Sequence, residues 1–246
     1  MNRPVAAAGR LLNRGLARVG LQVVRPDWNK SLGAFLAVLF RDLEINVVLD
    51  VGAHHGEYAQ MLRDSGYRGH IVSFEPVSDS FHQLEKACAH DPLWSARNVA
   101  LGSEPREMTI NVTKWSTAAS FLPPSKYGKE ERGTVVQATE TVRVERLDSI
   151  FADCLPAISN PRVFLKVDTQ GWDREVIRGA EQVVGSIPAI QVEMSVQPIY
   201  QGMPDYVEFI SYLRGLGYEI ATVAPVDRDA QLRLVEFDCV LIRPRG

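Results

Sequence analysis

Short apolar runs alternate with helical patterns along most of the chain. The β-rich runs predict strands at residues 46–50, 70–75, 95–100, 162–167, 188–194 and 218–224, and the closing run "LRLVEFDCVLI" predicts a last, antiparallel one. Apolar positions spaced three and four apart predict helices at residues 56–65, 78–90, 172–183 and 205–216. This alternation predicts an α/β fold with a doubly wound, mostly parallel seven-stranded sheet covered by helices.

The stretch from residue 103 to 148 breaks the alternation. Two β-rich segments, "REMTINVTKW" and "ETVRVERLD", enclose a polar middle at residues 122–133 that contains Pro and Gly. This pattern predicts an inserted β-hairpin whose loop faces the substrate, because loops on a rigid scaffold commonly carry binding residues. We expect a helical lead-in over residues 1–40 and one large domain over residues 41–246 that contains the insertion.

The first 26 residues carry five arginines and no acid. On a helical wheel Arg10, Arg14 and Arg18 share one side, and the opposite side carries Leu12, Leu16, Val19 and Val23. The segment is therefore predicted to form an amphipathic helix. Two roles fit it: packing of the apolar side on the domain, or binding of residues 1–25 to an anionic membrane surface.

The bulk composition narrows the classes of function. With 246 residues, 46% of them apolar, the chain can fill a large core, and its net charge of −3 predicts no nucleic-acid partner. The three cysteines are far apart and lack CxxC spacing, which argues against a disulfide framework or a zinc site and favours the cytoplasm. Since no apolar run approaches the roughly 18 residues of a membrane span, any membrane contact is expected to be peripheral, at the inner face.

Four acidic residues stand where predicted strands end: Asp50, Glu75, Asp168 and Glu193. In a doubly wound sheet, ligands bind outside the carboxyl ends of the strands. Although a single acid after a strand is often only a solvated strand end, four on one predicted rim indicate a polar site.

The turn after the first strand, "DVGAHHGEY", does not match a dinucleotide-binding loop. That loop needs G-x-G-x-x-G, whereas Gly52 and Gly56 here enclose three residues, and His54 and His55 would crowd a pyrophosphate. Glu75, 23 residues beyond Gly52, can accept both hydrogen bonds of a ribose diol. A ribose without a diphosphate indicates an adenosyl group.

Several segments carry a family resemblance: "VVLDVGAHHGEYAQMLR", "GYRGHIVSFEPVSDSFHQL", "NVALG", "VRVERLDSI", "FLKVDTQGWDREVIRGA", "IQVEMSVQPIY" and "VEFDCVLIR". Together they resemble the FkbM family of class I S-adenosylmethionine-dependent methyltransferases, whose members are mostly O-methyltransferases with a Rossmann-like fold. The pieces run in family order from about Val47 to Arg243, and K-V-D-x-x-G followed by V-I-R-G-A is the most specific of them.

The resemblance implies that S-adenosyl-L-methionine is the cofactor and assigns its contacts. The first motif lines the methionine part, Glu75 binds the ribose, the segment from Asn98 to Ala100 lies beside the adenine, and Asp168 faces the sulfonium. The implied cofactor-binding residues are Asp50, Gly52, Ala53, Gly56, Glu75, Pro76, Asn98, Ala100 and Asp168. The chain departs from the family at His54, where Asn is common, and at Gln170, where Glu is frequent.

Methyl transfer to an alcohol benefits from a general base, and the candidates are Asp168, Glu193, His54 and His55. Asp168 leads because both its strand-end position and the resemblance place it near the methyl group. Alternatively, Mg²⁺ held by Asp168 and Glu193, with Asp173 as a third ligand, would lower the pKa of the alcohol. The sequence leaves both mechanisms open.

The resemblance suggests an acceptor hydroxyl on a sugar of a glycolipid, polysaccharide or glycosylated natural product. Candidate residues for contact with such a sugar are Trp115, Ser116, Thr117, Ser120, Tyr127 and residues 200–203. Two other classes of function remain open: a nicotinamide-dependent oxidoreductase of Rossmann type, which the missing third glycine disfavours, and a methyltransferase-like binding protein without catalysis.

Overall fold

The computed structural model describes residues 31–114 and 116–244. The strands are β1 (Val47–Val51), β2 (His70–Phe74), β3 (Trp94–Arg97), β4 (Ala100–Leu101), β5 (Arg106–Thr113), β6 (Val136–Glu145), β7 (Val163–Val167), β8 (Ala189–Ser195), β9 (Glu219–Arg228) and β10 (Leu234–Ile242). The α-helices are α2 (Leu32–Asp42), α3 (Glu57–Asp64), α4 (Ser78–Cys88), α5 (Lys126–Glu130), α6 (Leu147–Cys154), α7 (Asp173–Arg178) and α8 (Tyr206–Gly215).

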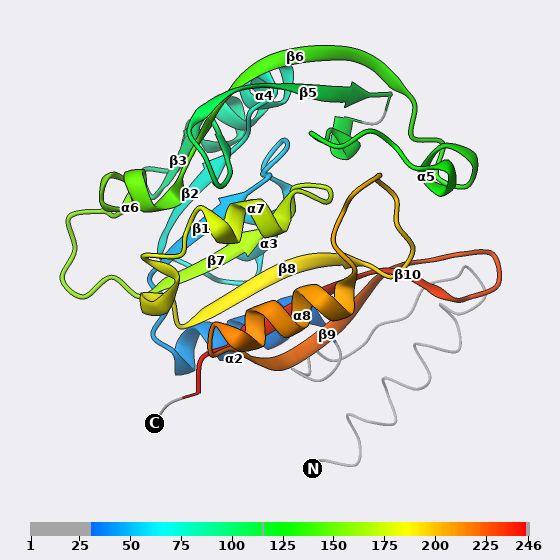
Figure 1. The fold of residues 1–246 in the computed structure, drawn as a ribbon. Coiled ribbons are helices and arrows are strands. Elements are labelled where there is room, and N and C mark those ends of the chain that lie inside the picture. Colours follow the sequence, from blue (N-terminus) through cyan, green and yellow to red (C-terminus); the bar gives the residue numbers. More distant parts are fainter. Residues whose placement is uncertain (1–30, 115, 245–246) are drawn as a thin grey trace, which may run out of the picture.

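Seven of these strands form a central sheet in the order β3-β2-β1-β7-β8-β10-β9 (Figure 1). β3, β2, β1, β7 and β8 pair in parallel, and β10 runs antiparallel to both β8 and β9. This arrangement confirms the predicted α/β fold and the antiparallel last strand. The order reverses between β1 and β7, which is where a doubly wound sheet opens a crevice for a ligand.

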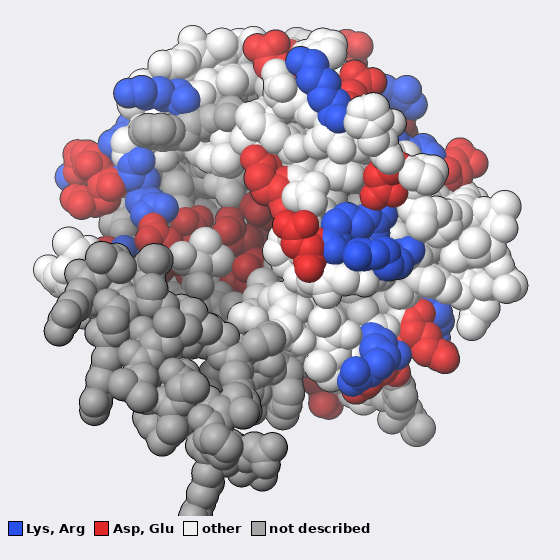
Figure 2. All heavy atoms as spheres, turned by 180° about the vertical axis from the view of Figure 1, so that it is seen from behind, with Lys and Arg blue, Asp and Glu red and all other residues white. Residues whose placement is uncertain are grey.

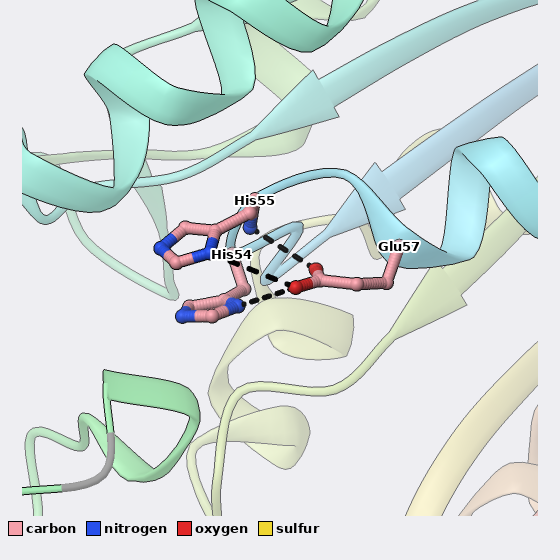
Figure 3. A group of neighbouring side chains, drawn as sticks. All are labelled: His54, His55 and Glu57. Atoms are coloured by element: carbon pink, nitrogen blue, oxygen red, sulfur yellow. Dashed lines mark hydrogen bonds and ion pairs between the residues drawn. The ribbon is translucent and has the colours of Figure 1, made fainter.

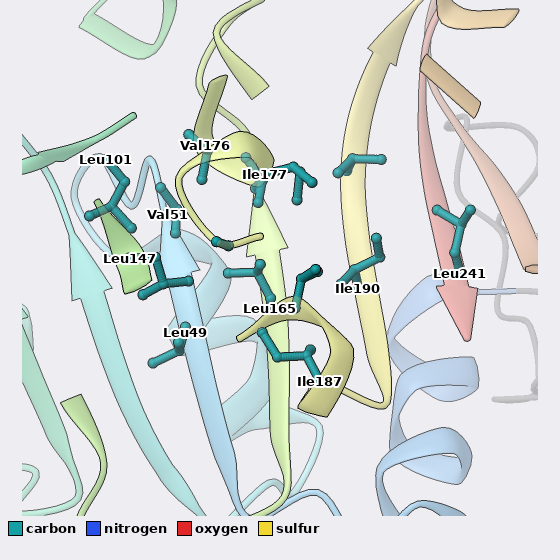
Figure 4. Packing of buried hydrophobic residues seen from close by; sticks show 14 of the residues in the cluster. Leu49, Val51, Leu101, Leu147, Leu165, Val176, Ile177, Ile187, Ile190 and Leu241 are labelled. Atoms are coloured by element: carbon teal, nitrogen blue, oxygen red, sulfur yellow. The ribbon is translucent and has the colours of Figure 1, made fainter. Parts of the chain in front are cut away.

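The central strand β1 is buried on both faces, as its sequence VVLDV requires. Val47, Leu49 and Val51 pack into one cluster with residues of α6, α7 and α8, and Val48 packs on the other face with residues of α2, α3 and α4. Figure 4 shows the first of these clusters, with leucine and isoleucine side chains of β1, β7 and β8 facing those of the helices. These two clusters hold β1 and β7 between the helical layers on either face of the sheet.

The insertion between β3 and α6 forms the predicted hairpin. β5 and β6 pair antiparallel over their length, and β4 joins them in a separate three-stranded sheet. The polar loop between β5 and β6 contains α5 and is joined to the β8–α8 loop by a bridge between Pro124 and Tyr200. The insertion therefore lies over the carboxyl end of the central sheet (Figure 1).

Several boundaries differ from the sequence prediction. The predicted strand at 95–100 is divided into β3 and β4, and the helix predicted at 172–183 ends at Arg178. Directly after the helix, Gly179 packs on Gly102, where a Cβ atom on Gly179 would lie 2.0 Å from the Gly102 carbonyl oxygen. Helix α6 was not predicted, and the proposed amphipathic helix of residues 1–25 lies outside the described residues. None of the helices within the described ranges is long and apolar enough to cross a membrane.

Candidate active site

The turn after β1 is brought against the loop after β7 by a glycine. Gly52 has a φ of +75°, which side-chain-bearing residues rarely adopt, and its backbone lies close to that of Asp168. A Cβ atom on Gly52 would stand 1.9 Å from the Asp168 carbonyl oxygen. Glycine is therefore required at the point where the two loops meet.

A buried lysine lies beneath this junction. Lys166 Nζ is 3.2 Å from Asp50 Oδ1 and 3.6 Å from Asp168 Oδ2, and it donates a 2.9 Å hydrogen bond to the Gly52 carbonyl. Burial disfavours its charge, but Asp50 and Asp168 outweigh this and raise the pKa of Lys166 above its usual value. Lys166 thus remains a cation and ties the ends of β1 and β7 together. Sequence reasoning missed it, although a lysine inside the apolar run VFLKV was a signal.

A first cavity of about 500 Å³ opens above these loops. Among the predicted cofactor-binding residues, its lining includes Gly52, Ala53, Glu75, Pro76, Ala100 and Asp168. Two predicted catalytic residues, His54 and Glu193, also line it. Apolar side chains complete one wall: Val99, Leu101, Ile110, Phe121 and Trp172.

Three predicted cofactor-binding residues do not line the first cavity. Asp50 is fully buried and accepts a hydrogen bond from Ser73 Oγ in addition to its ion pair with Lys166. Gly56 begins α3 with φ +95° and leaves room for the Trp94 ring, which a Cβ atom would contact at 2.7 Å. Asn98 donates from Nδ2 to the carbonyl oxygens of Glu75 and Pro76. In the described structure these three residues stabilise the loops that carry the cavity-lining residues.

Glu75 is held at the cavity wall by backbone donors. Its Oε2 accepts a hydrogen bond from the His54 N–H and its Oε1 one from the Val77 N–H, each of 2.9 Å. Burial raises the pKa of Glu75 to about 7, although these hydrogen bonds oppose the shift. Two of its roughly four lone-pair sites remain for other donors.

Asp168 and Glu193 are joined by the amide of Gln170. Gln170 Nε2 donates to Asp168 Oδ1 at 3.0 Å and to Glu193 Oε2 at 2.9 Å, and Gln170 Oε1 lies 2.9 Å from the Tyr200 hydroxyl. Burial, together with the neighbouring Asp168 carboxylate, raises the pKa of Glu193 well above its usual value. The backbone of Gln170 has φ +52°, so the residue is held in an unusual conformation. Sequence reasoning noticed Gln170 only as a departure from the family.

Asp173, the third proposed magnesium ligand, accepts hydrogen bonds from its own loop. Asp173 Oδ1 accepts hydrogen bonds from the N–H and hydroxyl of Thr169, and Oδ2 accepts one from the N–H of Gly171. The amide of Gln170 occupies the position between the other two carboxyl groups. This arrangement gives no support to Mg²⁺ held by Asp168, Glu193 and Asp173.

The two histidines of the first turn lie beside Glu57 at the start of α3 (Figure 3). His54 Nδ1 is 3.0 Å from Glu57 Oε1, the His55 N–H donates to Glu57 Oε2 at 3.1 Å, and the imidazole rings stack with centroids 3.5 Å apart. Burial lowers the pKa of His54, although its hydrogen bond to Glu57 opposes the shift. In the described part of the chain, these three residues are the group that could hold a metal ion.

A second cavity, of about 310 Å³, adjoins the first. The two share Thr117, Asp168, Gln170 and Glu193. The remaining lining comes from the insertion, the β8–α8 loop and β10: Ala118, Arg132, Thr134, Ile199, Tyr200 and Glu236. Asp168, Gln170 and Glu193 therefore stand where the two cavities meet.

Only some of the residues suggested for sugar contact line the second cavity. Ser120 donates from Oγ to the Gln170 carbonyl at 2.7 Å, and Tyr127 packs against the cluster of Ile199 and Tyr200. Trp115 lies outside the described residues. Of the suggested set, Thr117 and Tyr200 line the second cavity.

The model of the methyltransferase FkbM domain matches residues 50–220. The chain belongs to this methyltransferase family. The match confirms the resemblance and spans the loops after β1, β2, β7 and β8 that form both cavities. It gives no support to the nicotinamide-dependent oxidoreductase.

Among curated proteins, this FkbM methyltransferase is similar to the 2-O-methyltransferase NoeI of Sinorhizobium fredii, with 22% identity over 164 residues. The match covers 63% of this chain and 66% of NoeI, so the chain spans just under two thirds of that relative.

Solved structures with a similar arrangement include an rRNA methylase from Streptococcus thermophilus, with 8% identity, a TM-score of 0.48, and coverage of 92% of this chain and 100% of that one. Another is a putative RNA methyltransferase from Pyrococcus horikoshii, with 10% identity, a TM-score of 0.45, and coverage of 96% and 99%.

Proposed function

We propose that this FkbM methyltransferase uses S-adenosylmethionine to methylate a hydroxyl group, on a sugar of a glycolipid, polysaccharide or glycosylated natural product. One observation carries the proposal: Asp168, Gln170 and Glu193 stand where two adjoining cavities meet. A methyl donor in the first cavity and an alcohol approaching from the opposite side would meet beside two carboxyl groups.

The first cavity suits an adenosyl ligand. Its volume of about 500 Å³ lies within the range of small-molecule sites. The Glu75 carboxyl has lone pairs left for a ribose diol, and the wall of Val99, Leu101 and Ile110 suits the apolar face of an adenine. The carboxyl group of Asp168 can lie near a sulfonium, whose positive charge it would stabilise. When bound, S-adenosylmethionine supplies an electrophilic methyl group.

The chain must orient the acceptor and receive its proton. An in-line displacement needs the reacting atoms nearly collinear and about 3 Å apart, so positioning contributes a large part of the rate. The Gln170 amide holds the carboxyl groups of Asp168 and Glu193 in fixed positions. The proton of the acceptor hydroxyl would pass to one of these two groups.

Glu193 is the stronger candidate for the base. Both carboxyl groups border both cavities, but burial raises the pKa of Glu193, and a more basic carboxylate accepts a proton from an alcohol more readily. Asp168 lies beside Lys166 and is better suited to stabilising the donor's charge. His54 interacts with Glu57, and we assign it to the shape of the turn.

Methylation of an oxygen is supported by the name of NoeI, a 2-O-methyltransferase, and a polyhydroxyl acceptor is supported by the polar second cavity. The test is calorimetric titration with S-adenosylmethionine and S-adenosylhomocysteine, followed by transfer of a labelled methyl group to a glycolipid and polysaccharide extract. We expect micromolar binding and label on a sugar oxygen. Binding without transfer would indicate a binding protein that lacks catalysis, and binding of neither ligand by folded protein would contradict the proposal.

A further inference from the structure

The second cavity ends at the proposed reaction centre. Four of its lining residues also line the first cavity, so a group bound in it would reach Asp168 and Glu193 directly. Its other walls come from the insertion, the β8–α8 loop and β10, which are far apart in the sequence. An acceptor bound in the second cavity would therefore lie beside the proposed reaction centre.

The walls of the second cavity are held together by specific hydrogen bonds. The Ser125 N–H donates to the Ile199 carbonyl at 2.8 Å, the Ser125 hydroxyl donates to the Pro198 carbonyl at 2.6 Å, and the Gln201 N–H donates to the Pro123 carbonyl at 2.9 Å. The insertion and the β8–α8 loop therefore form one preorganised wall, which lowers the cost of ordering a bound ligand.

The charged groups of the second cavity are unbalanced. Three carboxyl groups, those of Asp168, Glu193 and Glu236, face it with the guanidinium of Arg132. Arg132 is already paired: its Nη1 contacts Asp227, and its Nη2 lies 3.3 Å from Glu236 Oε2. Asp227 and Glu236 therefore balance the positive charge of Arg132, and this guanidinium does not compensate Asp168 or Glu193. In the view from behind, acidic side chains also gather in a hollow of the surface (Figure 2).

These groups favour one class of ligand over another. Carboxylate and amide oxygens accept hydrogen bonds from hydroxyl groups, and the hydroxyl of Tyr200 and the side chain of Thr134 add polar contacts. A ligand carboxylate or phosphate would lie beside Glu193 and Glu236 without a free cation among the lining residues. The ionised carboxylates would repel such an anion strongly at this short range in a partly buried site, and the repulsion would grow as Glu193, whose pKa burial raises, loses its proton with rising pH.

We infer that the second cavity is the acceptor subsite and that it binds a neutral polyhydroxyl group and rejects a negatively charged one, an inference that rests on the proposed methyl transfer. The acceptor sugar then carries no uronate or phosphate next to the methylated hydroxyl. Arg132 acts as a structural cation that anchors the insertion to β9 and β10.

The test uses saturation-transfer NMR on the full chain with two matched probes, methyl β-D-glucopyranoside and methyl β-D-glucopyranosiduronic acid. Each is measured with and without S-adenosylhomocysteine. We expect saturation transfer from the neutral glycoside and a signal weaker by on the order of tenfold from the uronate. Equal signals from both probes, or no signal from either, would overturn the inference.

Three variants test whether the glycoside signal arises from the second cavity. Ala118 lines the second cavity and not the first, so Ala118→Trp should abolish saturation transfer while changing the affinity for S-adenosylhomocysteine by less than about twofold. Glu236→Gln should reduce the difference in saturation transfer between the two glycosides. Glu219→Gln, which changes an exposed carboxyl group on β9, should leave this difference unchanged. Persistence of the signal in Ala118→Trp would show that the sugar binds elsewhere. If the unaltered protein does not bind S-adenosylhomocysteine, the proposed function is contradicted. The inference is judged separately, because the difference in signal between the two glycosides is also measured without S-adenosylhomocysteine.

Discussion

The α-carbon of Gly52 and the carbonyl oxygen of Asp168 approach so closely that no side chain fits between them: a Cβ atom on Gly52 would lie 1.9 Å from that oxygen. The two residues are 116 positions apart in the sequence, at the ends of the adjacent strands β1 and β7. Their contact sets the distance between the turn with His54 and the loop with Gln170. The floor of the first cavity depends on it.

We therefore predict that Gly52→Ala disrupts the site. The substitution adds a backbone clash to the strain of a positive φ, which alone costs about 1–2 kcal/mol for an L-residue. Gly66→Ala is the matched control, because Gly66 has φ +94° with no atom within 4 Å of its Cβ position. Thermal unfolding and calorimetry should show a larger loss of stability for Gly52→Ala, together with loss of S-adenosylhomocysteine binding. Equal effects of the two substitutions would mean that the contact with Asp168 is easily relieved.

The proposed base gives a second prediction. Glu193→Gln keeps the shape of the side chain and removes its basicity, so kcat should fall by about 10²- to 10⁴-fold while the affinity for S-adenosylhomocysteine stays within a few-fold. Because the pKa of Glu193 is raised, the carboxylate form is lost as the pH falls, and kcat in the unaltered protein should increase with pH until Glu193 is ionised. The midpoint should lie above the ordinary range of a glutamate. A kcat unchanged in Glu193→Gln removes this residue from the mechanism, and the same assay on Asp168→Asn then tests the alternative base.

Gln170 provides a third prediction. Gln170→Glu would replace the amide between Asp168 and Glu193 with another carboxyl group, removing two hydrogen bonds and adding like-charge repulsion. We expect lower stability near neutral pH and, because three carboxyl groups then converge, a gain of Mn²⁺ binding measured by calorimetry. The unaltered protein, titrated in parallel, should bind Mn²⁺ at least tenfold more weakly by this measure. Equal Mn²⁺ affinity in both proteins would show that the amide does not determine cation binding at this position.

Glu75 gives a prediction about pH. Burial raises its pKa to about 7, and only the ionised group can accept hydrogen bonds at all its oxygen lone pairs. A ligand whose ribose donates to this carboxylate must displace the proton when the pH is below 7. The affinity for S-adenosylhomocysteine should therefore fall by up to about tenfold per pH unit below 7 and level off above it. Glu75→Gln should bind more weakly and show little pH dependence in the same titration; a pH dependence retained in that variant would assign the effect to another group.

The local part of the fold was predictable because it depends on neighbouring residues. The strand VVLDV and the turn that follows it are determined by an apolar run and two glycines, and β5 and β6 by alternating patterns around a polar loop. The boundaries that were wrong depend on distant contacts. Helix α7 stops where Gly179 meets Gly102, and the strand predicted at 95–100 is divided at Asn98, whose amide binds the carbonyls after β2.

The sequence by itself determined the type of fold, the family, and the acids at the strand ends, because periodicity and motif spacing are properties of short segments. Only the tertiary structure decided which of these residues face a cavity: Glu75, Asp168 and Glu193 do, whereas Asp50 is buried against Lys166. It also brought Arg132 and Tyr200 to the second cavity, from segments that no local pattern connects. The physical reason is that side-chain contacts across a sheet depend on strand order and loop packing, which arise only when distant parts of the chain bury their apolar surfaces together.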